Sequence, residues 1–412
     1  MVSREFSTVG VIGLGYIGLP TAAILADSGV RVIGMDVSAG NVEAINDGQV
    51  PFVEPGLREV LQRAVAAGML SASTQTPSAD AYIVAVPTPF TEGHSADLSY
   101  IEAAADGIAP KLTGGELVIL ESTSPPGATE HMAERILKAR PDLSAGDLLV
   151  AHCPERVLPG RIMVEMITND RIVGGLTVEA AQAAKVLYEN FCTGEVLLTD
   201  AKTAEMAKLT ENSFRDVNIA FANELSVICD QLGIDVWELI GLANHHPRVN
   251  ILQPGPGVGG HCIAVDPWFI VDAAPEAARL IRTARETNDA KPEWVLGRIE
   301  QALEHHGREA TVALMGLAFK ADIDDLRESP SLSIAERLAE RAPEARILAV
   351  EPHIEELPKS LAQASNVSLA GIDQALGSAQ VLVLLVDHGQ FKAIDPARLA
   401  GHTVIDSRGI WR

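Results

Sequence analysis

The sequence predicts an α/β protein in which two regions of alternating strands and helices flank one long helix. The N-terminal region opens with a buried-strand pattern, a glycine-rich turn and a helical pattern. Residues 199–232 contain no proline or glycine, and their apolar residues recur every three or four positions. Residues 311–406 then return to alternating strand and helix patterns. Such alternation is typical of parallel sheets that are covered by helices.

Composition excludes several classes of protein. The chain has 412 residues, which at roughly 150 residues per domain predicts two to three domains. A net charge of −23 disfavours nucleic-acid and anionic-membrane partners. The four cysteines show no CxxC spacing, so neither a metal site nor a disulfide framework is expected. The N-terminus lacks a signal-peptide pattern and the apolar run 379–386 is too short to span a bilayer, so we expect a soluble cytoplasmic protein.

The first motif lies in TVGVIGLGYIGLP, residues 8–20. Gly13, Gly15 and Gly18 form GxGxxG between a predicted strand and a predicted helix. Their missing side chains allow a pyrophosphate to approach the backbone N–H groups. Asp36 ends the next predicted strand, where a carboxylate can bind ribose hydroxyls and repel a 2′-phosphate. The pattern predicts NAD rather than NADP; a purely structural glycine turn is the alternative.

Three further predicted strands end in proline-rich segments. These segments are VPTPF at 86–90, ESTSPPG at 121–127 and CPERVLPG at 153–160. Ligands of parallel α/β sheets bind beyond the carboxyl ends of the strands, so the segments are expected to line one crevice, although each could be a simple loop.

The long helix and the C-terminal region carry candidate ligands for an anion. Lys208 and Asn212 are four positions apart, so they lie on one helix face, where they could share a ligand oxygen or simply face solvent. No GxGxxG opens the C-terminal region, which predicts a degenerate nucleotide-type domain. Lys320 and Arg327, within residues 319–330, could bind a diphosphate or form surface ion pairs.

A last unusual segment is PGPGVGGHCIAVDPWF, residues 254–269. It surrounds Cys262 with glycines, places His261 before it and Asp266 four positions after it. An ordinary turn beside a buried cysteine would explain the composition, but a reactive thiol would explain it equally well.

Taken in order, these motifs resemble those of the UDP-glucose dehydrogenase superfamily over nearly the whole chain. The matching motifs are GLGYIGLP, VPTPF, ESTSPPG, CPERVLPG, KLTENSFRDVNIAFANE, GPGVGGHCIAVDP and GLAFKADIDDLRESP. The resemblance implies a homodimer that oxidises C6 of a UDP-sugar twice, with two NAD. It also implies three domains: an NAD-binding domain at 1–198, a helical dimerisation and catalytic-cysteine segment at 199–305, and a UDP-sugar domain at 306–412.

The resemblance also implies roles for individual residues. Cys262 matches the thiol nucleophile, Lys208 and Asn212 the groups that stabilise an oxyanion, and Asp266 a residue that holds water and assists proton transfer. Glu155 matches the base for thioester hydrolysis, and Thr123 a hydroxyl that positions water. The implied cofactor contacts are Gly13, Gly15, Tyr16, Ile17, Gly18, Asp36, Pro87, Thr88 and Thr123. The implied substrate contacts are Arg156, Val157, Lys208, Asn212, Arg248 from the partner subunit, Gly259, Lys320, Arg327 and Arg408.

Two segments point to a branch of the superfamily. ERVLPG at 155–160 and HPRVNILQPGPG at 246–257 resemble enzymes of N-acetylated sugars, and within these the enzymes that oxidise UDP-N-acetyl-D-mannosamine. UDP-N-acetylglucosamine and UDP-glucose are the alternative substrates. A hydroxyacid or 6-phosphogluconate-type dehydrogenase would not need Cys262, and a non-catalytic NAD-binding scaffold would not need the reactive set.

Overall fold

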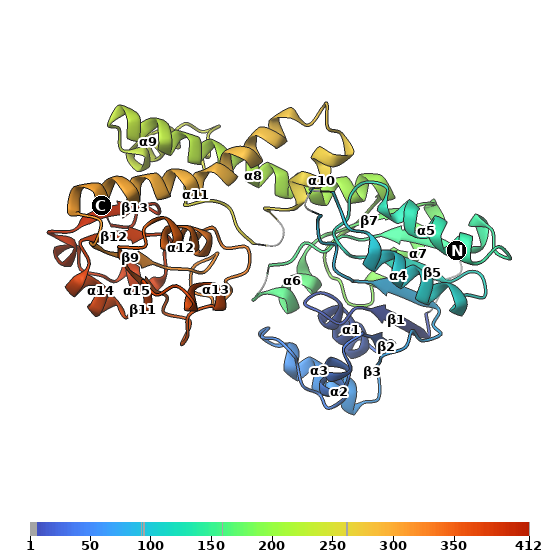
Figure 1. Cartoon of the computed structure of the whole chain (residues 1–412). Helices are drawn as coiled ribbons and strands as arrows, with labels where there is room; N and C mark the ends of the chain where they lie inside the picture. The colour runs from blue at the N-terminus through green and yellow to red at the C-terminus, as the bar shows by residue number, and fades with distance from the viewer. Residues whose placement is uncertain (1–5, 92, 94, 159, 261–262, 412) are drawn as a thin grey trace. The chain divides into compact units, whose positions relative to one another are not determined.

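The computed structural model describes residues 6–91, 93, 95–158, 160–260 and 263–411. The chain divides into two compact units, Met1–Glu211 and Asn212–Arg412, which are coloured blue to green and green to red (Figure 1). Each unit contains its own sheet, which confirms the predicted α/β class. The division into three domains at 198 and 305 stays a prediction.

The first unit is built on a sheet with the strand order β3-β2-β1-β4-β5-β6-β7-β8. Its strands are β1 Thr8–Ile12, β2 Arg31–Met35, β3 Leu70–Ser73, β4 Ala81–Val84, β5 Leu117–Leu120, β6 Leu149–His152, β7 Arg171–Gly175 and β8 Val196–Asp200. Its helices are α1 Gly18–Asp27, α2 Ala39–Asn46, α3 Leu57–Ala66, α4 Ser99–Ile108, α5 Ala128–Ala139, α6 Ile162–Thr168 and α7 Val178–Tyr188. The strands pair in parallel except β6 with β7.

The order of this sheet creates a ligand-binding position. β1 pairs in parallel with β2 on one side and with β4 on the other. The order in which successive strands are added to the sheet therefore reverses at β1. Side chains of β1 alternate between two apolar clusters: Val9 and Val11 pack in one and Ile12 in the other. Both faces of the sheet are therefore covered, and the open edge at the carboxyl ends of β1 and β4 is where such folds bind nucleotides.

The predicted long helix is α8, Ala201–Leu232. The prediction began two residues too early, because Thr199 and Asp200 complete β8, where they pair with β7. The boundary between the two units falls inside α8, between Glu211 and Asn212. Although α8 is long, neither it nor any other helix in the described chain combines the length and the apolar character that crossing a bilayer requires.

The second unit begins with helices and ends with a parallel sheet. After the second part of α8 come α9 Val236–Ala243, α10 Asp266–Ala273 and α11 Arg279–His306. The sheet has the order β11-β10-β9-β12-β13. Its strands are β9 Thr311–Met315, β10 Arg346–Val350, β11 Val367–Leu369, β12 Val381–Leu384 and β13 Thr403–Asp406, and its helices are α12 Pro330–Arg341, α13 Lys359–Ala362, α14 Ile372–Ser378 and α15 Gly389–Lys392.

The C-terminal sheet repeats the nucleotide-binding half of the N-terminal sheet. Its order corresponds to β3-β2-β1-β4-β5, and Gly316 after β9 has φ +99° where Gly13 after β1 has φ +91°. Glu351 accepts the Leu317 N–H at 2.8 Å, as Asp36 accepts the Leu14 N–H at 3.0 Å. The predicted second nucleotide-type domain is therefore present as a fold.

Glu351 has a different environment from Asp36, however. Its Oε2 lies 3.0 Å from His388 Nε2, and both side chains are fully buried. The other ring nitrogen of His388 accepts the Asp322 N–H at 2.9 Å, which leaves neither nitrogen for a metal ion. Glu351 is thus committed to internal hydrogen bonds, and a ribose cannot reach it as it could reach Asp36.

Candidate active site

The glycine-rich turn after β1 leaves space that side chains would fill. Gly13 has φ +91°, and a Cβ there would lie 2.6 Å from the Ala85 carbonyl oxygen. A Cβ on Gly18 would lie 1.8 Å from the Gly13 oxygen, whereas one on Gly15 would meet nothing within 4 Å. No side chain of a described residue caps α1 at Ile17. In the first turn of α1, Leu19 donates its N–H to the Gly15 carbonyl at 3.1 Å and Pro20 has no N–H, so the Gly18 N–H and the turn before it are left to bind the pyrophosphate of a dinucleotide, which fits NAD.

Asp36 is fixed at the end of β2 by backbone donors. Its Oδ2 accepts the Leu14 N–H at 3.0 Å and its Oδ1 accepts the Ser38 N–H at 2.8 Å. Each carboxylate oxygen has a second lone pair for a ribose hydroxyl. Beside the turn, the Tyr16 ring stacks on Phe52 with centroids 4.3 Å apart.

The ends of β4 and β5 form the other side of this cradle. Ser122 Oγ donates to the Val86 carbonyl at 2.7 Å, which holds the segments of Pro87, Thr88 and Thr123 together. Thr88 Oγ1 is inaccessible to solvent and has no hydrogen-bond partner within the described chain. A buried hydroxyl without a partner is costly, and a bound ligand would satisfy it.

Glu155 lies directly beyond β6, in CPERVLPG, and both of its oxygens are engaged. Oε1 accepts the Arg156 N–H at 2.7 Å, and Oε2 accepts a hydrogen bond from Arg171 Nη2 at 3.1 Å. Arg156 forms an ion pair with Glu211 of α8 at 2.6 Å and donates to the Asp170 carbonyl at 3.1 Å. Val157 packs against the apolar core. The arrangement presents a fixed carboxylate, as a general base requires.

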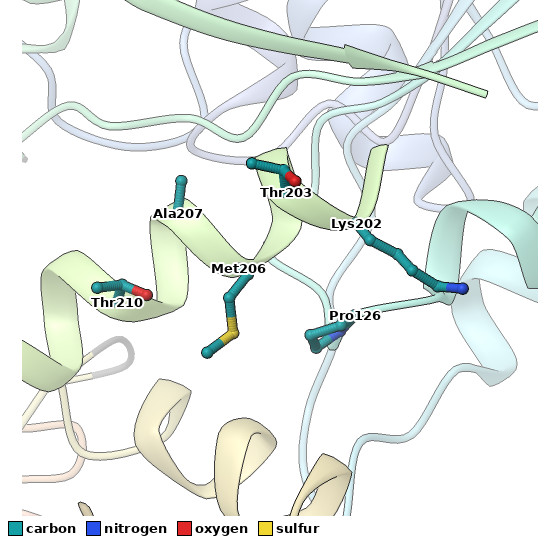
Figure 2. Close-up of a pocket in the computed structure, with 6 residues that line it drawn as sticks. All are labelled: Pro126, Lys202, Thr203, Met206, Ala207 and Thr210. Atoms are coloured by element: carbon teal, nitrogen blue, oxygen red, sulfur yellow. The ribbon is translucent and has the colours of Figure 1, made fainter. Parts of the chain in front are cut away.

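Two hollows of the first unit lie next to α8. A polar one of about 380 Å³ is lined by Arg156, Thr168, Asn169, Asp170 and Glu211, and so includes one predicted substrate contact. Another, of about 590 Å³, is lined by Pro126, Lys202, Thr203, Met206, Ala207 and Thr210. Figure 2 shows Met206 reaching from α8 toward the space beside Pro126. Of the predicted site residues that the structure describes, none lines this second hollow, whereas Lys208, on the same helix, is nearly buried.

In the second unit, two predicted catalytic residues meet. Asn212 Nδ2 donates to Asp266 Oδ2 at 2.5 Å, and both side chains are buried. Asp266 begins α10, only four positions after Cys262 in the sequence. Cys262 and His261 themselves lie outside the described residues. The amide therefore orients the carboxylate for which the resemblance implies a role in holding water and assisting proton transfer.

A seam of buried polar side chains lies between α8 and α11. It contacts Gly255 and Ile263, which precede and follow positions 261 and 262 in the sequence. Asn223 Oδ1 accepts the Gly255 N–H at 2.9 Å, and Asn223 Nδ2 donates to Asn288 at 2.8 Å. Arg285 Nη1 donates to Asp216 at 2.5 Å and to the Ile263 carbonyl at 3.4 Å. Burial raises the pKa of Asp216 to about 6, although Arg285 opposes the shift. No local pattern in the sequence indicates this seam, since Asp216 and Arg285 are 69 residues apart.

Two glycines of the segment 254–269, Gly259 and Gly260, pack against residues 319–330. A Cβ on Gly259 would lie 2.4 Å from the Glu328 carbonyl oxygen, and the Gly260 N–H donates to the same oxygen at 3.3 Å. Gly259 therefore permits close backbone packing, and its role as a substrate contact stays a prediction. Lys320 is exposed in residues 319–330. Arg327 forms an ion pair with Asp325 at 2.7 Å, which is the surface ion pairing that the sequence offered as the alternative to diphosphate binding.

Arg408 lies close to the other end of the glycine-rich segment. A Cβ on Gly255 would lie 2.7 Å from Arg408 Nη1, so a side chain there would displace the guanidinium. Arg408 also binds Asp387 at 2.7 Å, and Lys392 binds the same carboxylate at 2.8 Å. Burial opposes ionisation of Asp387, but Lys392 and Arg408 lower its pKa to about 2. Arg248 follows α9 and is exposed.

Comparison with known proteins identifies the family. Sequence models of the UDP-glucose/GDP-mannose dehydrogenase family match the chain in three parts: the NAD binding domain at residues 7–192, the central domain at 202–290 and the UDP binding domain at 313–412.

Individual relatives match over the whole length. The chain is 56% identical to the NDP-N-acetyl-D-galactosaminuronic acid dehydrogenase of Ralstonia nicotianae, covering 100% of this chain and 97% of that protein. It is also 56% identical to the UDP-N-acetyl-D-mannosamine dehydrogenase of Yersinia pestis, covering 99% and 100%. Among solved structures, the UDP-D-ManNAc dehydrogenase of Pyrococcus horikoshii is 38% identical, with a TM-score of 0.87 over 98% of this chain and 96% of that one. The chain is an NAD-dependent dehydrogenase that belongs to the UDP-glucose/GDP-mannose dehydrogenase family.

Proposed function

We propose that this enzyme oxidises C6 of UDP-N-acetyl-D-mannosamine to the uronate, with two NAD reduced for each sugar. The observation that carries the proposal is the full-length 56% identity to the UDP-N-acetyl-D-mannosamine dehydrogenase of Yersinia pestis. The hydrogen bond between Asn212 and Asp266, beside Cys262 in the sequence, supports the chemistry.

The first oxidation converts the C6 alcohol into an aldehyde. Bound NAD supplies the acceptor for the hydride that leaves C6 in each of the two oxidations. Asp266 assists departure of the hydroxyl proton, through a water molecule that it holds. Lys208 and Asn212 stabilise the negative charge that develops on the oxygen.

The second oxidation needs a covalent link to the enzyme. The Cys262 thiolate adds to the aldehyde carbon to give a thiohemiacetal, and loss of the second hydride from C6 turns it into a thioester. Water then attacks the thioester while Glu155 takes its proton, so the C–S bond breaks, the carboxylate forms and the thiol is restored. The balance is one alcohol, one water and two NAD giving one carboxylate, two NADH and three protons.

The cofactor assignment predicts a change of preference in Asp36→Ala. Loss of the carboxylate removes two ribose hydrogen bonds and also the repulsion of a 2′-phosphate. We expect NAD to bind about tenfold more weakly and the preference for NAD over NADP to fall by at least as much. Titration of both cofactors against wild type and variant measures this, and an unchanged NAD to NADP ratio would remove Asp36 from the site.

The sugar is tested by comparing kcat/KM for UDP-ManNAc, UDP-GlcNAc, UDP-GalNAc and UDP-glucose through NADH production. A site built for one amide orientation leaves polar atoms unpaired with an epimer, at a cost of roughly 1–3 kcal/mol. UDP-ManNAc should therefore exceed UDP-GlcNAc by about tenfold or more. Equal or reversed preference would reject the mannosamine assignment.

A second sugar is favoured by one specific observation. The relative from Ralstonia nicotianae, which is named for N-acetyl-D-galactosaminuronic acid, is as similar to this chain as the mannosamine enzyme of Yersinia pestis. Preference for UDP-GalNAc in the same assay would therefore assign the galactosamine substrate and leave the catalytic residues as proposed.

We propose further that the enzyme is a homodimer whose contact includes α8. Phe214, Phe221 and Ile228 repeat every seven residues along this helix, and their exposed fractions are 69%, 51% and 42%. An apolar stripe with this spacing fits the same helix of a second copy.

The dimer proposal predicts that Arg248 acts in the partner's site. Mixing Arg248→Ala chains with Cys262→Ala chains should restore part of the activity, because one site of each mixed dimer receives both intact groups. Activity of purified heterodimers measures this against each homodimer. A mixed dimer as inactive as both parents would place Arg248 in its own subunit's site.

A further inference from the structure

Glu155 belongs to a buried charged cluster at the carboxyl ends of β5 and β6 and the start of β7, in the first unit's sheet. Arg171, the first residue of β7, places Nη2 3.1 Å from Glu155 Oε2 and Nη1 3.8 Å from Glu121 Oε1. The exposed fractions of the three side chains are 4% for Arg171, 9% for Glu155 and 0% for Glu121. Two carboxylates, which follow β5 and β6, therefore share one guanidinium almost without water.

Among the residues that the structure describes, the other groups around Glu121 do not supply a second positive charge. Thr21 of α1 and Tyr188 of α7 each donate a hydroxyl hydrogen bond to Glu121 at 3.1 Å. The Cys153 thiol, after β6, lies 3.7 Å from Arg171 Nη1. Burial raises the pKa of Cys153 to about 12 and raises that of Tyr188 well above its ordinary value. Both stay neutral near pH 7, so the charge of the cluster changes only through Glu121 and Glu155.

One cation cannot neutralise two anions in this environment. With both carboxylates ionised the cluster would carry one uncompensated negative charge, which is costly away from solvent. The structure favours a proton on Glu121: burial, and then the charge of Glu155, raise the pKa of Glu121 to about 7. Glu155 keeps the shorter contact with Arg171, 3.1 Å against 3.8 Å.

We propose that Arg171 and Glu121 are positioning residues for Glu155, which fix its carboxylate and set how readily that carboxylate accepts a proton. The inference rests on the proposed function, in which Glu155 takes the proton of the hydrolytic water. Arg171 and the Arg156 N–H hold one oxygen of Glu155 each, which prevents rotation of the carboxylate.

The protonation state of Glu121 changes the charge around Glu155. When Glu121 is ionised, it competes for Arg171 and places a second negative charge beside Glu155, and both effects favour transfer of the water proton to this pair of carboxylates. When Glu155 then takes the water proton, Arg171 still has an ionised partner in Glu121, so the guanidinium is never left unpaired. Hydrolysis of the thioester should therefore speed up as the pH rises through about 7, the pKa of Glu121.

The test separates the oxidations from hydrolysis. Enzyme is mixed rapidly with saturating NAD and UDP-ManNAc, and NADH is followed from the first turnover. Arg171→Lys keeps the positive charge but loses the planar fork that reaches both carboxylates. Glu121→Gln keeps the shape and removes the charge. Both variants should release a burst of about two NADH per site at the wild-type rate, then turn over about tenfold more slowly because hydrolysis limits.

The pH profile separates positioning from mere stability. In the wild type the hydrolysis rate should rise through about pH 7, and in Glu121→Gln this rise should be absent. Glu116→Gln is the matched control: Glu116 is also a buried carboxylate, but it lies at the other end of β5 and bonds Thr113 and Gly114. It should keep both the wild-type rate and the rise.

The outcomes are distinct. Equal slowing of burst and hydrolysis in Glu121→Gln, or an unchanged pH profile, would overturn the positioning role, and this variant decides the matter even where Arg171→Lys does not fold. Glu155→Gln serves as the reference. If it slows hydrolysis and the two positioning variants do not, only this inference fails. If Glu155→Gln leaves hydrolysis unchanged, the proposed role of Glu155 fails and this inference with it.

Discussion

Cys262→Ala is expected to abolish formation of the uronate while NAD binding survives. Without the thiol no thiohemiacetal can form, so there is no covalent intermediate from which the second hydride could leave to give the thioester. We expect the rate of uronate production to fall by at least about 10⁴-fold, which corresponds to about 5.5 kcal/mol. The NAD cradle at Gly13–Asp36 belongs to the other unit of the chain, so the dissociation constant of NAD should stay within about twofold of wild type.

The remaining cysteines provide the control for this variant. Cys153, Cys192 and Cys229 are buried and free, and Cys229 packs between apolar side chains of α9. Replacement of each by serine should leave substantial turnover. Normal uronate production by Cys262→Ala would contradict the covalent mechanism, whatever the sugar.

Arg285→Met is expected to destabilise the second unit strongly. Arg285 and Asp216 are both fully buried and lie 2.5 Å apart, so the variant leaves an uncompensated carboxylate between α8 and α11. Breaking such a pair costs about 3–5 kcal/mol. Denaturant unfolding of the variant and of wild type measures the free-energy difference.

This loss should depend on pH. Burial raises the pKa of Asp216 to about 6, so the favourable contribution of its protonated form is present below the unfolded pKa and is lost as the pH rises through about 6. In the wild type, Arg285 lowers the pKa of Asp216. Without Arg285 this lowering is absent, so the loss of stability extends to higher pH. The destabilisation should therefore be larger at pH 8 than at pH 5, and Asp216→Asn in the same chain should restore part of it at pH 8. A loss below about 1 kcal/mol at pH 8, or one equal at the two pH values, would contradict this account.

Features that depend on local backbone geometry could be predicted from the sequence. Gly13 and Gly18 are required because a Cβ would strike the backbone, and glycine is the residue that signals such positions. The long helix was visible from its apolar period. Thr199 was nevertheless assigned wrongly, because hydrogen bonding to β7 decides its conformation and no local pattern reports that pairing.

The buried charges could not be predicted. Arg171 meets Glu121 and Glu155 only because β5, β6 and β7 are neighbours in the sheet, and the sequence analysis did not anticipate β7 or β8. Nor did it anticipate that Glu351 would bind His388, although the β–α alternation correctly indicated a second nucleotide-type fold. Partners far apart in the sequence leave no periodic signal, so such contacts require the fold.

The central claim is that the second oxidation passes through a thioester on Cys262. The most direct measurement is mass spectrometry of Glu155→Gln protein, quenched in acid during turnover with UDP-ManNAc and NAD. The account predicts a sugar-nucleotide acyl adduct on the peptide that contains Cys262, removable by hydroxylamine and absent without NAD. Release of two NADH per sugar and formation of uronate, with the Cys262 peptide unmodified at every quench time, would contradict it.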